Sequence, residues 1–138
     1  MFLKKKNTPN DYNYLIKIGA LLVHAAKIDE NYSTLEDEII KKTLIELGAK
    51  NENVEKLIID SKNIEENSNQ ILDFTKEVKN LDESRKIKII ESLWKIIYSN
   101  KNADIYETNL MRRLAGLLYI DSKIMGDIKN RVYKESLK

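Results

Sequence analysis

The sequence predicts an all-α protein, a compact bundle of about seven helices built from two pseudo-symmetric helical hairpins. Two observations support this fold class. One proline and four glycines in 138 residues leave few points where the backbone must turn, so long helices with short polar connections are expected. Residues 22–47 also align without gaps on residues 93–118, at a constant spacing of 71 residues. Two copies of one unit, neither able to bury its apolar face alone, predict a pseudo-symmetric domain.

Each copy reads as a helix, a short polar loop and a second helix, and the alignment pairs residues of similar chemistry. Asp29 aligns with Asn100, Ser33 with Asp104, Glu36 with Glu107, Ile39 with Leu110, Lys41 with Arg112 and Lys42 with Arg113.

The first helix is predicted over residues 9–27. Thr8 can accept hydrogen bonds from free amides as the N-cap, and Pro9 suits the first helical position because its missing N–H has no partner there. Apolar residues then recur at spacings of three and four on a broad stripe, which predicts a mostly buried helix. Residues 1–8, which precede the cap, are expected to be flexible.

The second helix is predicted over residues 34–47. Ser33 and Glu36 form a capping box, in which each side chain bonds the backbone amide of the other residue. Gly48 follows, and glycine favours the left-handed conformation that ends many helices.

The remaining helices follow the same logic. A third and a fourth are predicted over residues 54–64 and 69–79, separated by a polar break. Asp82 is expected to cap a fifth, central helix over residues 83–99. The sixth begins at the cap Asp104 with Glu107 three residues later, and the seventh runs from residue 121 or 122 to about residue 135 with a narrow apolar stripe.

Composition fits one domain over residues 1–138 and excludes several classes of site. A chain with 42% hydrophobic and 33% charged residues can bury a core. Its 24 basic and 22 acidic residues give a net charge of +2, which is too balanced to predict a nucleic-acid partner. The absence of cysteine excludes disulfides and thiolate sites and suits a reducing compartment. A monomer and a homodimer are both compatible with this composition.

The N-terminal segment resembles a secretory signal only in part. Lysines at residues 4–6 precede an apolar run at residues 15–26, but Lys17 interrupts the run, which is shorter than the roughly 20 residues that span a bilayer. We therefore expect a cytoplasmic protein. Residues 1–6 place apolar and basic groups side by side, which predicts at most peripheral membrane contact.

Both copies follow one pattern: small or apolar residues, an acid or amide, six residues, a glutamate and then an apolar pair. With the segments 81–85 and 111–115, this pattern resembles the TerB-like tellurite-resistance family, which includes the N-terminal domain of the DjlA membrane co-chaperone. The resemblance covers residues 15–120. It implies an all-α bundle without established enzymatic activity, a divalent-cation site on the acidic loops, and a role in stress response or chaperone-linked assembly.

The resemblance carries the family's loop residues onto six positions of this chain. They are Asp29, Ser33 and Glu36 in the first copy and Asn100, Asp104 and Glu107 in the second. The chain departs from the family at three places, because Glu30 and Lys101 replace the expected glycines and Asn100 replaces an aspartate.

If the two loops come together, the predicted ligands of a divalent cation, calcium or magnesium, are Asp29, Glu36, Asp104 and Glu107. The first loop begins like an EF-hand, but Thr34 and Ile40 stand where that motif needs glycine and glutamate. The alternative is that these residues only cap helices and complement the helix dipoles.

Other candidate sites are weaker. His24 lies in an apolar helix without cysteine or a second histidine, so it reads as a half-buried histidine rather than a zinc ligand. No hydrolase triad or phosphate loop is visible, and we predict that the protein is not an enzyme. Basic residues near the C-terminus interleave with acidic ones, which predicts a mixed-charge surface. The basic residues are Arg112, Arg113, Lys123, Lys129, Arg131 and Lys134.

The sequence therefore predicts a non-enzymatic, protein-binding adaptor whose partner docks in a groove between helices. The alternative is a divalent-metal-binding regulator that uses the two acidic loops.

Overall fold

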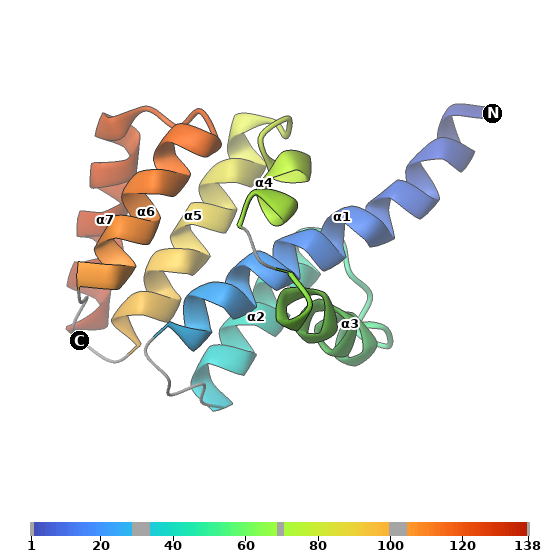
Figure 1. The fold of residues 1–138 in the computed structure, drawn as a ribbon, viewed down its shortest axis with the longest axis horizontal. Helices are drawn as coiled ribbons and strands as arrows, with labels where there is room; N and C mark the ends of the chain where they lie inside the picture. Colours follow the sequence, from blue (N-terminus) through green and yellow to red (C-terminus); the bar gives the residue numbers. More distant parts are fainter. Residues whose placement is uncertain (1, 29–33, 69–70, 100–104, 138) are drawn as a thin grey trace.

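The computed structural model describes the backbone of residues 2–28, 34–68, 71–99 and 105–137, with the side chains from residue 12 onward except Leu72, Glu77 and Ile105. Over these ranges the chain forms a bundle of seven helices and no strand (Figure 1), which confirms the predicted fold class. The helices are α1 (Phe2–Lys27), α2 (Thr34–Glu46), α3 (Val54–Glu66), α4 (Leu72–Val78), α5 (Glu83–Tyr98), α6 (Ile105–Leu117) and α7 (Ser122–Ser136).

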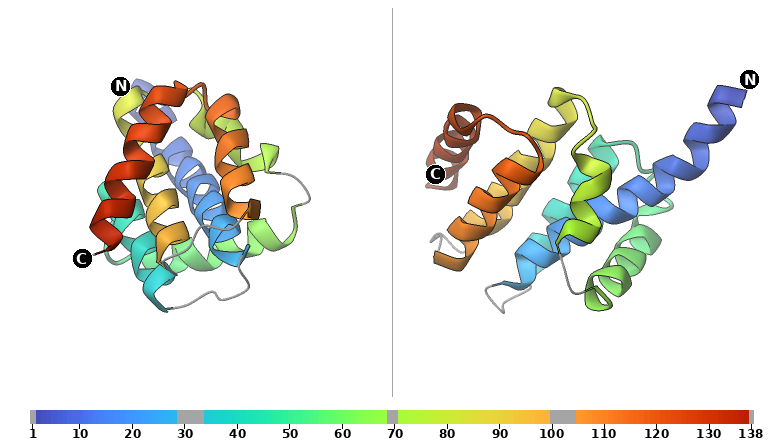
Figure 2. Two further views of the ribbon diagram at one scale, coloured as in Figure 1. Left: turned by 90° about the vertical axis from the view of Figure 1, so that its left-hand side faces the viewer. Right: turned by 45° about the horizontal axis from the view of Figure 1, so that its top comes forward.

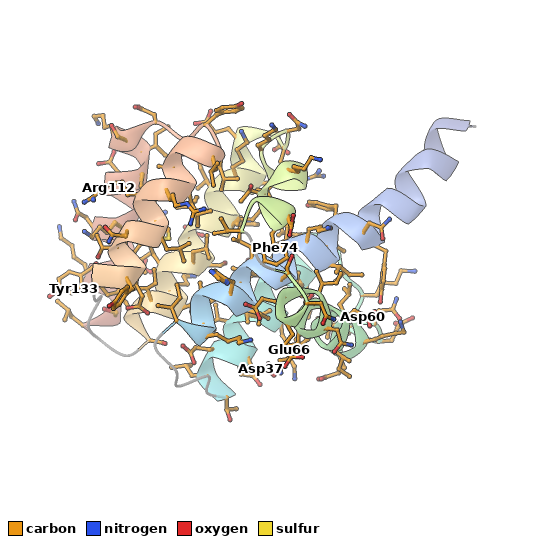
Figure 3. All side chains as sticks on the ribbon, in the orientation of Figure 1. Asp37, Asp60, Glu66, Phe74, Arg112 and Tyr133 are labelled. Carbon is orange, nitrogen blue, oxygen red and sulfur yellow. The ribbon has the colours of Figure 1, made fainter. Side chains whose placement is uncertain are left out.

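Helices α1 and α5 organise the bundle. Helix α1 packs against α2, α3, α4 and α5, while α5 packs against α1, α2 and α7. Phe74 of α4 lies toward α1 (Figure 3) and is 1% exposed. Helix α5 buries residues on most of its length, from Lys86 to Tyr98, because apolar side chains occupy more than one of its faces. The central position predicted for the fifth helix is confirmed, and α1 shares it.

The internal repeat extends beyond the two hairpins that the sequence predicts. Helix α3 packs along α1 as α7 packs along α5, so each unit comprises three helices. Residues of α3 and α7 that lie 71 positions apart are buried in matching pairs, which are Val54 and Met125, Leu57 and Ile128, and Ser61 and Val132. The structure therefore consists of the units α1–α3 and α5–α7, with the short α4 between them.

The second helix of each unit ends in the same way. Gly48 has a backbone φ of 125° and Tyr119 a φ of 57°, and they are the residues with positive φ in the described backbone. The next amide in each copy bonds a carbonyl five residues back, as helix C-caps do. These bonds join Ala49 to Leu44 and Ile120 to Ala115, each at 2.9 Å. The predicted cap at Gly48 is confirmed, and its counterpart uses a tyrosine.

The predicted start of the first helix is wrong. Helix α1 begins at Phe2 rather than at Pro9, so Thr8 lies within the helix and is not its N-cap. A proline inside a helix lacks the N–H that would bond the carbonyl four residues earlier, and its ring crowds that carbonyl, at a cost of about 3 kcal/mol. The first turns of α1 extend beyond the rest of the bundle (Figure 1).

Two further boundary predictions need correction. Helix α4 spans only Leu72–Val78, and α3 runs on to Glu66 because its backbone bonds continue through the predicted polar break. Asp82 occupies the N-cap position of α5, but its side chain makes no capping hydrogen bond. Where the structure describes the chain, no helix has both the length and the apolar composition needed to cross a membrane.

Candidate functional site

The structure describes two of the four predicted metal ligands, Glu36 and Glu107. Asp29 and Asp104 lie outside the described residues, as do the predicted caps of α2 and α6. Glu36 is 0% exposed and Glu107 is 2% exposed, each in the first turn of its helix, where a carboxylate complements the positive end of the dipole.

The helix ends that flank the two acidic loops lie at one end of the bundle. The C-terminal ends of α1 and α5 and the N-terminal ends of α2 and α6 all face this end in Figures 1 and 2. No group of three carboxylate or histidine side chains gathers within the described part of the chain. The four-residue metal site therefore stays a prediction.

An apolar groove lies between α2, α5 and α7, next to the same end of the bundle. Its volume is about 360 Å³. Helix α2 contributes Leu35 and Ile39, α5 contributes Lys95 and Tyr98 with the following Ser99, and α7 contributes Val132, Glu135 and Ser136. We call this the apolar groove.

Tyr98, which lines the apolar groove, packs against two further aromatic rings. The ring centroid of Tyr98 lies 5.7 Å from that of Trp94 and 5.1 Å from that of Tyr133. Burial raises the pKa of the Tyr98 phenol, and the nearby Tyr133 and Glu107 add to the effect, so Tyr98 remains uncharged at neutral pH. Leu35 is 55% exposed at the rim. The groove thus combines a buried aromatic residue, Tyr98, with the exposed aliphatic side chain of Leu35.

A second cleft, which we call the polar cleft, lies between α1 and α6 and has a volume of about 520 Å³. It is lined by His24, Ile28, Tyr106, Asn109, Leu110 and Arg113.

The two clefts occupy equivalent positions in the two units. Residues that line one cleft lie 71 positions from residues that line the other, in the pairs Leu35 and Tyr106, Ile39 and Leu110, His24 and Lys95, and Ile28 and Ser99. The bundle therefore presents the same concave site twice, and the two copies have diverged into an apolar one and a polar one.

A buried carboxylate holds the histidine of the polar cleft. Glu65 of α3 is 9% exposed, and its two oxygens lie 3.0 Å from His24 Nδ1 and 2.7 Å from Lys27 Nζ. Burial raises the pKa of Glu65, but the hydrogen bonds from Lys27 and His24 outweigh this effect, so the pKa is lower than usual. The half-buried histidine predicted at position 24 is confirmed. The sequence did not identify Glu65 as the partner of His24, because no local pattern connects residues that lie 41 positions apart.

Comparison with protein families agrees with this architecture. A family model described as Tellurite resistance protein TerB matches residues 15–130. The chain belongs to the TerB family. The match begins within α1 and ends within α7, so it covers α2 to α6 in full and most residues of both clefts. Comparison with curated proteins and with solved structures gives no match.

Proposed function

We propose that this TerB-family chain is a non-enzymatic adaptor that binds a segment of a partner protein in the apolar groove, in a stress response of the kind that the family's name indicates or in chaperone-linked assembly. The observation that carries the proposal is the groove itself. Its lining joins Ile39, Tyr98 and Val132 from three helices, with the exposed Leu35 at its rim. Apolar surface that is concave and exposed is typical of protein interaction sites.

The shape and chemistry of the groove favour an amphipathic helix as the bound segment. Apolar side chains one turn apart on such a helix would contact Ile39 and Val132. Lys95 and Glu135 at the edges would pair with charges of either sign on its polar face.

Site-specific photo-crosslinking in cells tests the proposal. A benzophenone amino acid at position 35 should crosslink to one partner, and the same probe at position 59 should not. Ile59 is a matched control because it is 59% exposed, close to the value for Leu35, but lies on α3 away from the groove. Leu35→Asp should abolish capture of that partner while Ile59→Asp retains it, with both variants folded by circular dichroism. Equal capture by the two variants would reject the groove as the docking site.

A second candidate function, a divalent-cation regulator, has one specific observation in its favour. Glu36 and Glu107 are buried at equivalent positions, and the helix ends beside the two acidic loops lie together. Calcium or magnesium would bind oxygens of these residues and of Asp29 and Asp104.

Thermal unfolding of chelator-treated protein tests this candidate. A cation at about 100 times its dissociation constant should raise the unfolding free energy by about 2.7 kcal/mol. Asp29→Ala should remove that response if Asp29 is a ligand. If Asp29 only caps a helix, Asp29→Ala should lower the unfolding free energy by the same amount with and without the cation.

A further inference from the structure

The polar cleft has two facing walls of different chemistry. Tyr106, Asn109, Leu110 and Arg113 recur at spacings of three and four, so they share one face of α6. His24 and Ile28 face them from the C-terminal end of α1. A volume of about 520 Å³ is within the range of small-molecule sites, which runs from roughly 300 to 1,000 Å³.

Among the described residues that line the cleft, Arg113 carries the permanent charge. Arg113 is exposed and has no ion pair within the described part of the chain, and no described carboxylate lines the cleft. A guanidinium without an acidic partner can bind two oxygens of one oxyanion. The Asn109 amide lies one helical turn before Arg113, and its N–H₂ group supplies further donors.

His24 adds the requirement that the bound ligand carry a hydrogen-bond donor. Its Nδ1 lies 3.0 Å from the buried Glu65 carboxylate, which accepts the Nδ1 proton as a hydrogen bond. In a neutral imidazole this tautomer leaves a lone pair on Nε2, which can accept a hydrogen bond from an O–H group. The cleft therefore presents donors on α6 and an oriented acceptor on α1. Monohydrogen phosphate has three oxygens that accept and one hydroxyl that donates, so it matches both walls.

We propose that the polar cleft binds inorganic phosphate in its monohydrogen form, with Arg113 and Asn109 donating to phosphate oxygens and His24 Nε2 accepting from the phosphate hydroxyl. The Glu65 carboxylate fixes the ring of His24, and the exposed Tyr106 lines the cleft beside them. The equivalent apolar groove lacks this chemistry, because Lys95 stands where the other unit has His24 and Leu35 where it has Tyr106. The site is independent of the adaptor function proposed above.

Calorimetric titration of the whole protein with sodium phosphate at pH 7.5, at constant ionic strength, tests the proposal. We expect saturable binding at one site and a change in the nitrogen resonance of His24 Nε2. Sulfate, which has no O–H at this pH, should bind at least about tenfold more weakly, the equivalent of one hydrogen bond to a charged group. Phenyl phosphate, whose ester is largely a dianion without O–H, should also bind more weakly.

Two arginine variants provide a matched comparison. Arg113→Gln should weaken phosphate binding at least about tenfold, because it removes a charge-assisted contact. Arg112→Gln removes the same charge from the next residue, which does not line the cleft. Arg112 Nη1 lies 3.4 Å from Asn109 Oδ1, the oxygen that does not donate to phosphate, so this variant should leave the affinity within about twofold. Both arginines are exposed, so both variants should fold.

Three results would each overturn the proposal. The first is the absence of saturable phosphate binding to the unmodified protein. The second is an equal loss of affinity in the two arginine variants, which would indicate general attraction to a basic surface. The third is sulfate or phenyl phosphate binding as tightly as phosphate, since His24 would then not recognise the hydroxyl.

Discussion

At the scale of single residues, the buried Glu65 carboxylate connects α1 to α3 through His24 and Lys27. Its pKa lies below the ordinary value of 4.5, because the hydrogen bonds from Lys27 and His24 outweigh the opposing effect of burial. A carboxyl group with a lowered folded-state pKa stabilises the fold fully above its unfolded pKa. That stabilisation is lost as the pH falls through the lowered folded value. Part of the acid denaturation of this protein below about pH 4.5 should therefore come from Glu65.

Glu65→Gln should lower the unfolding free energy by about 1 to 2 kcal/mol at pH 7, and the deficit should shrink as the pH falls below 4.5. The loss of unfolding free energy should be modest because His24 and Lys27 are 36% and 44% exposed, so water screens their charges. Urea denaturation at several pH values measures the effect. Glu66→Gln is the control, because Glu66 is the exposed neighbour of Glu65 on α3 (Figure 3). Equal deficits in the two variants at all pH values would contradict the assignment.

At the scale of helix pairs, the contact between α1 and α3 depends on the absence of a side chain at position 19. A Cβ atom added to Gly19 would lie 2.1 Å from Ser61 Oγ and 2.9 Å from Ser61 Cβ. Ser61 is fully buried, and its hydroxyl donates to the Leu57 carbonyl at 2.7 Å, so it has little freedom to move.

Gly19→Ala should therefore destabilise the protein by about 1 to 3 kcal/mol, as overpacking does in other cores. Ser61→Gly alone should cost about 1 kcal/mol, because glycine is a poor helix former. In the Gly19→Ala background, however, Ser61→Gly should be stabilising, since it removes both clashing atoms. Denaturant unfolding of the two single variants and the double variant measures this reversal. Additive losses in the double variant would show that the two residues do not interact.

The glycines at a helix end and in a helix interior should respond oppositely to alanine. Gly48 has a φ of 125°, which side chains rarely adopt, so Gly48→Ala should cost about 1 kcal/mol or more. Gly126 lies inside α7 with no atom within 4 Å of an added Cβ, so Gly126→Ala should add about 0.5 to 1 kcal/mol. Thermal unfolding of the two variants measures both the expected loss of stability in Gly48→Ala and the expected gain in Gly126→Ala. A stabilised Gly48→Ala variant would contradict the proposed role of this C-cap.

The helix boundaries show what local sequence patterns can and cannot predict. Gly48 ends α2 as predicted, because a left-handed cap is a local property of the chain. The prediction that α1 starts at Pro9 was wrong, because the helix continues on the N-terminal side of Pro9 despite the cost of about 3 kcal/mol that an interior proline carries. The extension of the repeat to α3 and α7 was visible in principle, since Leu57 and Ile128 keep the 71-residue spacing. That extension is hard to recognise because Ser61 aligns with the apolar Val132, and few neighbouring residues of α3 and α7 match at the same spacing.

At the scale of the whole molecule, the sequence predicted the family, the pseudo-symmetry and a groove between helices, but it located neither cleft. Each cleft joins helices from both units, as Leu35 and Tyr98 do in the apolar groove. The same is true of His24 and Tyr106 in the polar cleft. Such sites depend on how the two units cross, and residue spacing within one unit carries no information about that crossing. The acidic loops were easier to recognise because their residues are adjacent in the chain.

The two units share one core, so we expect that neither unit folds stably by itself. Helix α5 packs against α1 and α2 of the other unit, and a hydrogen bond of 2.6 Å joins the buried hydroxyls of Thr43 and Ser92 across that contact. Ile89, Leu93 and Ile96 are completely buried in the whole chain. A fragment of residues 79–138 would lose the helices that cover part of α5, and a chain of about 60 residues is only marginally stable even with a complete core.

We therefore expect the fragment 79–138 to have reduced helicity and no cooperative thermal transition by circular dichroism. Mixing it with an equal amount of the fragment 1–78 should restore both, because the missing surface of α5 would be covered again. The intact chain should unfold in one transition by the same measurement, as most single domains of this size do. Cooperative unfolding of the fragment 79–138 by itself would mean that the repeat units are separate domains. The equivalence of the two clefts would then reflect two independent folds placed side by side, whereas a shared core requires that neither cleft exists until both units have folded together.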